Sequence, residues 1–340
     1  MRAMLPHSSD LSRKVRDLVR AHRAELRTRT YGNADLNPPA GPCEVVPVVA
    51  ADGARLRVHA YGPADGDVIV LVHGWTCCLE YWNPQINAFA GEYRVIAYDV
   101  RGHGESELGT APLTTDRLAD DLADVLDTVL QRGQRAVLVG HRLGGMTIQA
   151  WAGRYPHRVQ RQLLAVLLTN TAAGDLIAET TVIPFLNRGL ARLPFRAGLL
   201  GLSAPILFPP IAPVRWIFRR QIMSLATVGH LAEFGLNIVR SCPARVRGRF
   251  GTLLSHLDVG RGAAKLTVPT TVIAGSADDM TPPVHSERIV EMLTEAGSLD
   301  GYKILPTGHL GNVEAYQEFN VELARVAKSA FGIPARVVGA

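Results

Sequence analysis

The most constraining feature of this 340-residue sequence is the segment Gly140-His141-Arg142-Leu143-Gly144-Gly145. An apolar run from Arg135 to Val139 precedes it, and a helical pattern from Met146 to Tyr155 follows it. A strand that passes directly into a helix needs a tight turn, where glycine avoids clashes and the central residue takes a strained backbone conformation. The segment therefore predicts a buried strand, a strained turn at position 142 and a helix.

The spacing of Gly140 and Gly144, two residues on either side of position 142, matches the nucleophile elbow G-x-S-x-G. In that motif the central serine presents a hydroxyl that attacks the substrate. Here the central residue is Arg142, and a guanidinium that stays protonated in proteins cannot act as a nucleophile. The pattern indicates the scaffold of such a site but not its activity.

Composition and charge limit the classes of partner. The chain is 47% hydrophobic and 20% charged, which suits one large soluble α/β domain or a domain with an insertion. Its formal charge is +5, and residues 171–265 contain twelve basic and four acidic side chains, so this segment carries +8 and the rest −3. A local positive region favours a membrane surface, an anionic ligand or simple solubility. No nucleic-acid motif accompanies it, so we expect no nucleic-acid partner.

The cysteines and the N-terminal residues bear on cofactors and location. Cys43, Cys77, Cys78 and Cys242 show no metal-ligand spacing, so we expect reduced thiols, no metal and no cofactor. Residues 1–30 lack the continuous apolar run of a signal peptide, which predicts a cytoplasmic protein. Residues 197–214 are uncharged, but four prolines argue against a transmembrane helix and leave a surface contact with lipid as the alternative.

The alternation of strand and helix patterns predicts an α/β fold with a mostly parallel, doubly wound sheet whose ligand site lies at the carboxyl ends of its strands. Residues 1–42 are predicted to form an Arg-rich amphipathic helix and a connector; the helix packs on the domain or binds a membrane or partner. Residues 43–170 and 266–340 are the predicted core, and 171–265 a helical cap insertion. The expected strands are 44–49 and 55–61 in a hairpin, then 67–72, 93–98, 136–139, 164–168, 267–274 and 302–305, and the expected core helices are 114–131, 146–155, 283–295 and 313–331.

Four sequence blocks occur in an informative order: His73-Gly74-Trp75, Asp99 to Ser106, Gly140 to Gly145, and the pair Asp278 and His309. In this combination the chain resembles the capped α/β-hydrolases, a family that includes esterases, C–C hydrolases, haloalkane dehalogenases and epoxide hydrolases. The resemblance extends over nearly the whole chain from about Glu44 onward. Asp99 and Arg101 are predicted to be structural and to tie a loop between two strands.

The resemblance implies a triad acid at Asp278, with Asp279 as the alternative, and a general base at His309. The order of elbow, acid and histidine is that of the family. In such a triad the acid fixes the imidazole tautomer and stabilises its positive charge, while the imidazole accepts a proton from the nucleophile or from water.

The resemblance also places an oxyanion hole at the backbone N–H groups of Trp75 and Leu143. Backbone donors do not depend on side-chain identity, so this hole is compatible with Arg142. Further ligand contacts are expected from Gly74, His141 and Met280.

Two branches of the capped α/β-hydrolases, the dehalogenases and the epoxide hydrolases, do not fit this sequence. Dehalogenases and epoxide hydrolases are similar to one another in carrying an elbow Asp followed by Trp, whereas Leu143 follows here. Epoxide hydrolases also need cap tyrosines, and every tyrosine lies outside residues 170–265. Leu143 to Met146 resembles the ester, lactone or peracid branch. The Leu, Ile, Phe and Pro of the predicted cap suggest a lipophilic acyl substrate, or else they only pack the cap on the core.

Arg142 leaves three hypotheses for function. The first is a carboxylic-ester hydrolase whose serine has been replaced, naturally or by engineering, and whose activity is impaired. The second is a binding or signalling pseudo-hydrolase in which Arg142 holds an anionic ligand. The third is an enzyme that activates water through His309 and Asp278 without a covalent intermediate. The sequence also permits Arg142 to pair with Asp278 and so close the site.

Overall fold

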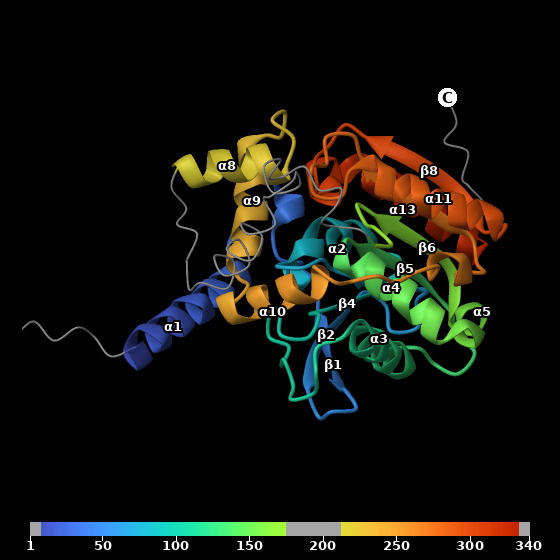
Figure 1. Ribbon diagram of the computed structural model, residues 1–340, viewed down its shortest axis with the longest axis horizontal. Helices are drawn as coiled ribbons and strands as arrows, with labels where there is room; N and C mark the ends of the chain where they lie inside the picture. The colour runs from blue at the N-terminus through green and yellow to red at the C-terminus, as the bar shows by residue number, and fades with distance from the viewer. Residues whose placement is uncertain (1–7, 175–211, 333–340) are drawn as a thin grey trace, which may run out of the picture.

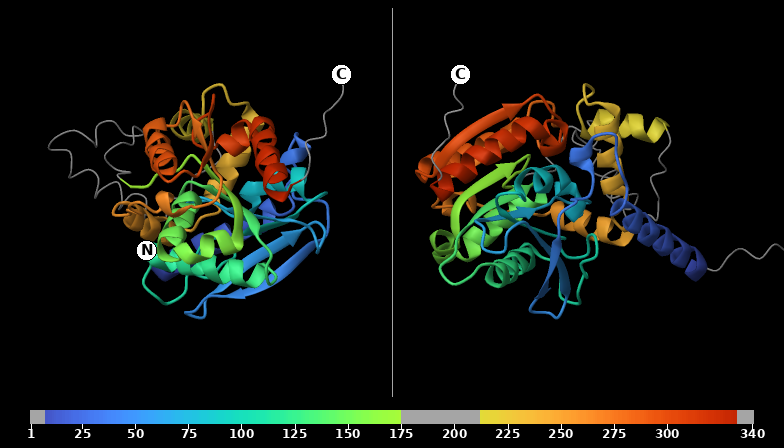
Figure 2. Two further views of the ribbon diagram at one scale, coloured as in Figure 1. Left: turned by 90° about the vertical axis from the view of Figure 1, so that its right-hand side faces the viewer. Right: turned by 180° about the vertical axis from the view of Figure 1, so that it is seen from behind.

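The computed structural model describes residues 8–174 and 212–332, which form a twisted sheet with helices on both faces (Figures 1 and 2). The strands are β1 (Cys43–Val49), β2 (Arg55–Tyr61), β3 (Val68–Val72), β4 (Arg94–Tyr98), β5 (Ala136–His141), β6 (Leu163–Thr169), β7 (Thr270–Gly275) and β8 (Leu299–Leu305).

The sheet order is β1-β2-β4-β3-β5-β6-β7-β8. Strand β2 pairs antiparallel with β1 and β4, and all the other pairings are parallel. This arrangement confirms the predicted hairpin and the mostly parallel α/β sheet. Strands β3, β5, β6, β7 and β8 therefore all end at one edge, and the loops that follow them converge there.

The sheet has an apolar core on each of its two faces, and successive side chains of its buried strands contribute to the two cores in turn. Val70 and Val72 of β3 face a layer made by α3 (Thr115–Val129), α4 (Leu143–Arg154) and α11 (Pro283–Glu295). Ile69 and Leu71 face the opposite layer, which contains the helices α2 (Asn83–Phe89), α12 (Gly311–Glu314) and α13 (Tyr316–Phe331). Because successive side chains of a strand point to opposite faces, a strand covered on both sides reads as a continuous apolar run.

Two helices differ from the expectation. The predicted final helix, 313–331, is interrupted at Ala315 (φ −125°, ψ 52°), which separates α12 from α13. Helix α2, which follows a short 3-10 helix (Leu79–Trp82), was not predicted. Its polar residues Asn83 and Gln85 are buried together with Ile86, so the segment lacks the polar face on which recognition of an amphipathic helix depends.

Three helices lie between β6 and β7 in the described residues: α8 (Ala212–Ile222), α9 (Gly229–Arg240) and α10 (Ala244–Leu254). We refer to them as the insertion helices. Residues 175–211 of the predicted cap lie outside the described residues, so its boundaries remain a prediction.

The N-terminal helix α1 (Ser8–Leu26) packs on the insertion helix α9 and extends outward from the body of the molecule (Figure 1). The Nε of Arg23 donates to the carbonyl of Ser241 (2.9 Å), and a ring nitrogen of His22 donates to that of Asn237 (2.8 Å). The predicted packing is therefore found for the C-terminal part of this helix.

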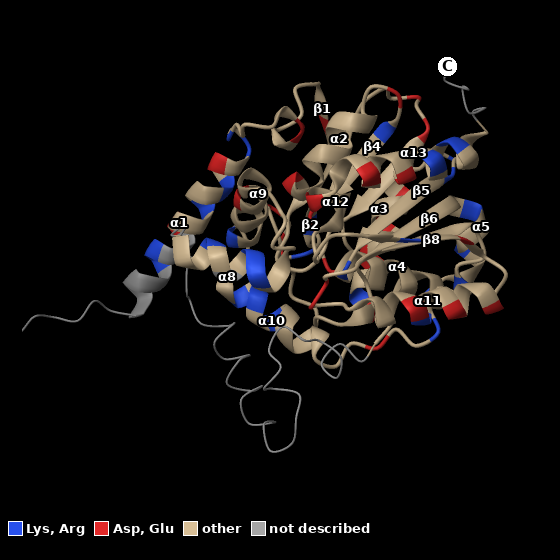
Figure 3. Cartoon of the chain, turned by 90° about the horizontal axis from the view of Figure 1, so that it is seen from above, with Lys and Arg blue, Asp and Glu red and all other residues tan. Residues whose placement is uncertain are grey.

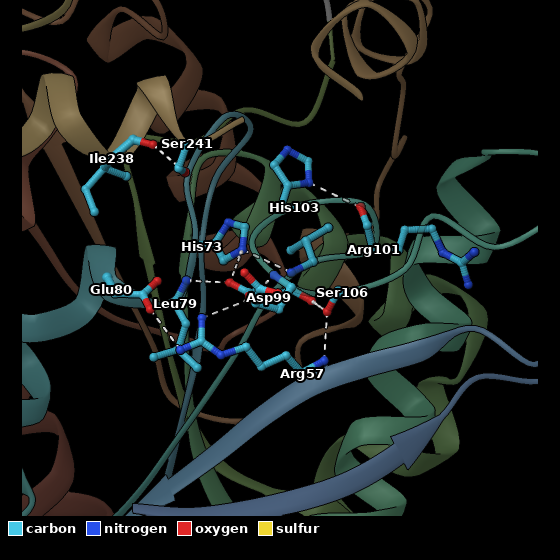
Figure 4. Close-up of polar contacts among 12 residues, drawn as sticks. Arg57, His73, Leu79, Glu80, Asp99, Arg101, His103, Ser106, Ile238 and Ser241 are labelled. Atoms are coloured by element: carbon cyan, nitrogen blue, oxygen red, sulfur yellow. Dashed lines mark hydrogen bonds and ion pairs between the residues drawn. The ribbon is translucent and has the colours of Figure 1, made fainter. Parts of the chain in front are cut away.

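A buried polar network holds the loop after β4 (Figure 4). The Asp99 carboxylate accepts hydrogen bonds from the backbone N–H of Leu79 (2.6 Å) and of Glu105 (2.9 Å) and from Arg57 Nη1 (3.2 Å). Arg101, also buried, forms ion pairs with Asp121 and Asp52. These contacts give Asp99 and Arg101 the structural role expected of them.

The first test concerns the close contact between α4 and β3. A Cβ added at Gly144 would lie 2.1 Å from the carbonyl oxygen of Val72, far inside the van der Waals distance. We expect Gly144→Ala to lower the free energy of unfolding by about 3 kcal/mol or more, measured by urea denaturation. Gly91→Ala is the matched control, because a Cβ there meets nothing within 4 Å, and it should change stability by at most about 0.5 kcal/mol. Equal stability of both variants would contradict this packing.

Candidate active site

The turn between β5 and α4 has the geometry of a nucleophile elbow. Arg142 has φ 48° and ψ −111°, a conformation that a residue with a side chain rarely adopts. Its N–H donates to the carbonyl of Thr169 (3.1 Å), and its carbonyl accepts from the Met146 N–H (3.0 Å) and the Thr171 hydroxyl (2.7 Å). The neighbouring strand end thus holds the strained residue in place.

The Arg142 side chain is buried, with 7% of its surface exposed. Its guanidinium carbon lies 5.0 Å from the centre of the Trp75 ring, and its Nε has no hydrogen-bond partner among the described residues. Burial lowers the pKa of Arg142 to about 10, and the attraction of Asp278 and Cys77 for the guanidinium opposes this shift. The side chain is therefore still a cation at neutral pH.

The structure brings Asp278 and His309 together at the ends of β7 and β8. The Nδ1 of His309 lies 2.9 and 3.0 Å from the two carboxylate oxygens of Asp278. Since a carboxylate accepts hydrogen bonds, Nδ1 carries the proton, and Nε2 faces the other way. That Nε2 is buried and has no hydrogen-bond partner in the described part of the chain. Arg142 therefore does not displace His309 from Asp278.

The Asp278 carboxylate is held by more than the histidine. It accepts hydrogen bonds from the Asn170 amide (2.9 Å), the Thr281 hydroxyl (2.8 Å) and the N–H groups of Met280 and Thr281 (2.9 Å each). Burial would raise the pKa of Asp278, but the attraction and hydrogen bond of His309, followed by the bonds from Thr281 and Asn170, lower it to about 2. The carboxylate is thus ionised at neutral pH and oriented toward the imidazole.

The Glu314 carboxylate fixes the loop that carries His309. It accepts hydrogen bonds from the N–H groups of Gly308 (3.1 Å) and Leu310 (3.0 Å), and from the Ser224 N–H (2.7 Å) and the Thr227 hydroxyl (2.6 Å). The last two donors belong to the loop between α8 and α9. This one side chain therefore connects the histidine loop to the insertion helices.

The expected oxyanion donors follow β3 and begin α4. Leu143 is the first residue of α4, and the N–H groups of a first helical turn have no acceptor within the helix. Trp75 follows Gly74, where an added Cβ would lie 2.8 Å from His141 Nδ1 and 3.2 Å from Arg142 Cβ. The loop of Gly74 and Trp75 thus lies directly against the elbow, which places the two predicted donors on adjoining segments.

The other predicted ligand contacts have structural partners. His141 is buried, and its Nε2 lies 2.9 Å from the carbonyl of His309, so it donates to that oxygen. Burial lowers the pKa of His141 well below its usual value, which keeps the ring neutral. Met280 contacts Asp278 through its backbone N–H. Roles of Gly74, His141 and Met280 in ligand binding remain predictions.

Three other features of the described residues bear on function: whether a cysteine is activated, whether a group of side chains could hold a metal ion, and whether a helix could cross a membrane. Burial raises the pKa of Cys77 to about 12 and that of Cys78 well above its usual value, so neither thiol is an activated nucleophile. Within residues 8–174 and 212–332 no group of three or more His, Cys, Asp and Glu side chains could hold a metal ion. In the same ranges no helix combines the length and apolarity needed to cross a bilayer.

Residues 67–181 match the model of the alpha/beta hydrolase fold. The non-heme chloroperoxidase of Streptomyces lividans is 35% identical over 274 residues, which cover 77% of this chain and 93% of that protein. The chain belongs to the α/β-hydrolase fold family. A bifunctional esterase/perhydrolase of Acinetobacter calcoaceticus is 37% identical and covers 77% of this chain and 92% of its own. Among solved structures, an esterase from Exiguobacterium antarcticum has a TM-score of 0.67 at 17% identity over 84% of this chain and 100% of its own, which shows a shared fold.

Three contacts in this α/β-hydrolase were not predicted from the sequence: Asn170 and Thr281 on the acid, and Glu314 on the histidine loop. Asn170 follows β6 directly, and its φ of 46° marks a strained position. Glu314 stands five residues after His309. A polar residue at the end of a parallel strand is a usable signal, but the other two positions carry none until the loops are placed in space.

The second test concerns the ionised Asp278. A carboxyl group with a folded-state pKa near 2, against about 4 when unfolded, stabilises the protein above pH 4 and loses this contribution as the pH falls toward 2. Between pH 5 and pH 2 we expect the free energy of unfolding of the unsubstituted protein to fall by about 2 kcal/mol more than that of Asp278→Asn. Urea denaturation at the two pH values measures this difference.

The control for this measurement is Asp65→Asn, a change at an exposed carboxyl group. It should leave the acid dependence of stability close to that of the unsubstituted protein. If Asp278→Asn gave the same decrease between pH 5 and pH 2 as the control, the carboxylate would not be ionised and stabilised as the contacts indicate.

Proposed function

We propose that this protein is a carboxylic-ester type α/β-hydrolase for lipophilic acyl compounds whose turnover is impaired because Arg142 occupies the nucleophile position. The observation that carries the proposal is the coexistence of an elbow backbone at Arg142 (φ 48°) with an undisturbed contact between His309 and Asp278 (2.9 Å). Relatives named as an enol-lactonase from Acinetobacter baylyi, at 25% identity, and as the esterase/perhydrolase support the ester and lactone branch.

The missing step is formation of the acyl-enzyme. In a serine hydrolase the imidazole removes the hydroxyl proton as the oxygen attacks the carbonyl carbon, and backbone N–H groups stabilise the resulting oxyanion. The guanidinium of Arg142 has no lone pair available for that attack. Loss of the nucleophile in a preorganised triad lowers turnover by roughly a million-fold, while the remaining groups retain about 10³ to 10⁴ over water.

The third test restores the hydroxyl. We expect the unsubstituted protein to hydrolyse short p-nitrophenyl esters barely above buffer, and Arg142→Ser to raise the rate by about three orders of magnitude or more, because His309 keeps the contact with Asp278 that a serine hydroxyl needs for activation. Initial rates of p-nitrophenol release measure the effect.

The matched control is the double substitution Arg142→Ser with His309→Ala, which should return the rate to that of the unsubstituted protein. Equal, low rates for the single and double substitutions would contradict an otherwise intact site. A substantial rate in the unsubstituted protein that depends on His309 and is not raised by Arg142→Ser would instead support activation of water without a covalent intermediate.

A second candidate function, binding of an anionic acyl ligand, is favoured by two unpartnered hydrogen-bond donors. Arg142 Nε and Trp75 Nε1 are buried and lack hydrogen-bond partners among the described residues. Asp278 attracts the Arg142 guanidinium, but the two form no ion pair, and Arg142 has none with any other described residue. A carboxylate beside a buried cation forms charge-assisted hydrogen bonds with it. We infer that a lipophilic carboxylate is the ligand class for this function.

The fourth test measures this binding by thermal unfolding. We expect decanoate to raise the melting temperature of the unsubstituted protein, with a stabilisation of about 2.7 kcal/mol at a ligand concentration one hundred times Kd. Arg142→Ala should abolish the shift because it removes the cation. Methyl decanoate, which has the same chain without the charge, is the control ligand and should give a much smaller shift. Equal shifts for the acid and the ester, or a shift that survives Arg142→Ala, would contradict the carboxylate site.

A further inference from the structure

Lys and Arg residues gather at one end of the molecule (Figure 3), and we call the exposed ones there the basic face. It is formed by α1, α8 and α10, which lie at the end of the molecule opposite α5 (Val159–Gln162) in Figure 1. The exposed basic residues of these three helices are Arg13, Lys14, Arg20, Arg215, Arg220, Arg245 and Arg249.

Helix α8 combines this charge with an exposed aromatic ring. Trp216 is 58% exposed, and Arg215 and Arg220 are exposed beside it, while Phe218 is buried. The Arg220 guanidinium carbon lies 5.8 Å from the centre of the Trp216 ring. The helix contains no acidic residue. Its outer face therefore presents an indole among cations, a combination typical of side chains at the interface between a membrane and water.

Helix α10 continues the positive surface. Arg245 and Arg249 are four residues apart and both exposed, so they lie on one side of the helix, whereas Val246 and Phe250 are buried. This helix also contains no acidic residue. The exposed charged residues of α8 and α10, the two helices on either side of α9, are thus all positive.

Helix α1, which packs on α9, adds an amphipathic segment at the same end of the molecule. Its C-terminal part is held to α9 by Arg23 and His22, while Leu18 is 55% exposed and Arg20 is exposed beside it. Of its acidic residues, Glu25 is paired with Arg29, and Asp17 is exposed next to Leu18. An exposed leucine on an amphipathic helix with more basic than acidic side chains is a pattern of helices that lie in a membrane interface.

We propose that the basic face docks on the surface of an anionic phospholipid bilayer. Charge complementarity carries the inference: α8 and α10 each contain three arginines and no acidic residue, and anionic bilayers attract clustered Lys and Arg. Trp216 and Leu18 provide the apolar contacts that such an interface accommodates and that a phosphate backbone does not require. The inference is independent of the chemistry at Arg142.

The fifth test uses the full chain and sedimentation with extruded vesicles. We expect binding to vesicles of phosphatidylcholine mixed with phosphatidylglycerol, little binding to pure phosphatidylcholine, and weakening as the salt concentration rises. Arg215→Ala with Arg220→Ala should lower the partition coefficient by about fivefold for each arginine removed, roughly 25-fold together. Trp216→Ala should lower the part of the binding that persists at high salt, because that part depends on apolar contact.

The matched control removes the same charge at the other end of the molecule. Arg132 and Arg161 are exposed and line one groove beside α5, so Arg132→Ala with Arg161→Ala should leave vesicle binding within about twofold. Circular dichroism and thermal unfolding verify that all variants are folded. Equal losses for the two double substitutions, or equal binding to neutral and anionic vesicles, would overturn the inference. So would binding to duplex DNA without binding to vesicles, which would assign the face to nucleic acid instead.

Discussion

The strained backbone at position 142 is the constraint on which the site depends. A residue held outside its favoured φ/ψ region costs about 1 to 3 kcal/mol and persists only where its surroundings fix it. Here Thr169 and Thr171 of the adjoining strand end hold its N–H and carbonyl, and Gly144 allows α4 to reach the β3 backbone. None of these contacts involves the side chain of residue 142. The backbone of the elbow is therefore held with arginine at position 142, and the contact between His309 and Asp278 forms beside it.

Asp278 and His309 are likewise positioned by contacts that do not involve the side chain of residue 142. Asp278 is positioned by hydrogen bonds from Asn170 and Thr281, and the backbone of His309 is positioned by His141 and by the loop bonds of Glu314. These four partners lie at or after the ends of four different strands, β5, β6, β7 and β8, so the pair depends on the relative placement of four segments. A sheet whose parallel strands end at one edge provides that placement without reference to the residue at the elbow.

Features that depend on neighbouring residues, such as the elbow, could be predicted from the sequence. Hydrogen bonds between residues far apart in the chain could not. Glycine spacing predicts the elbow because the clash that excludes a side chain arises within the turn and the adjacent strand. Asp278 and His309 follow from a family resemblance, and the structure puts them 2.9 Å apart. The supporting hydrogen bond from the Ser224 N–H to the Glu314 carboxylate joins residues 90 positions apart, and no periodicity of the sequence indicates it. Helix α2 was missed for a related reason, since its buried polar residues have partners, including Asn312 with Gln85, that only the tertiary structure reveals.

A permanent cation at the elbow changes which species the site stabilises. Catalysis requires contacts that are stronger in the transition state than in the ground state. In a serine hydrolase the negative charge that the site stabilises develops only during attack, and it lies on the oxyanion near backbone donors. Arg142 instead supplies positive charge before any reaction and is buried where desolvation strengthens its attraction for anions. Such a group favours a carboxylate already formed, the product of ester hydrolysis, over a neutral ester. Under the proposed function, an arginine in the place of the attacking oxygen thus shifts the affinity of the site from the ester toward the carboxylate.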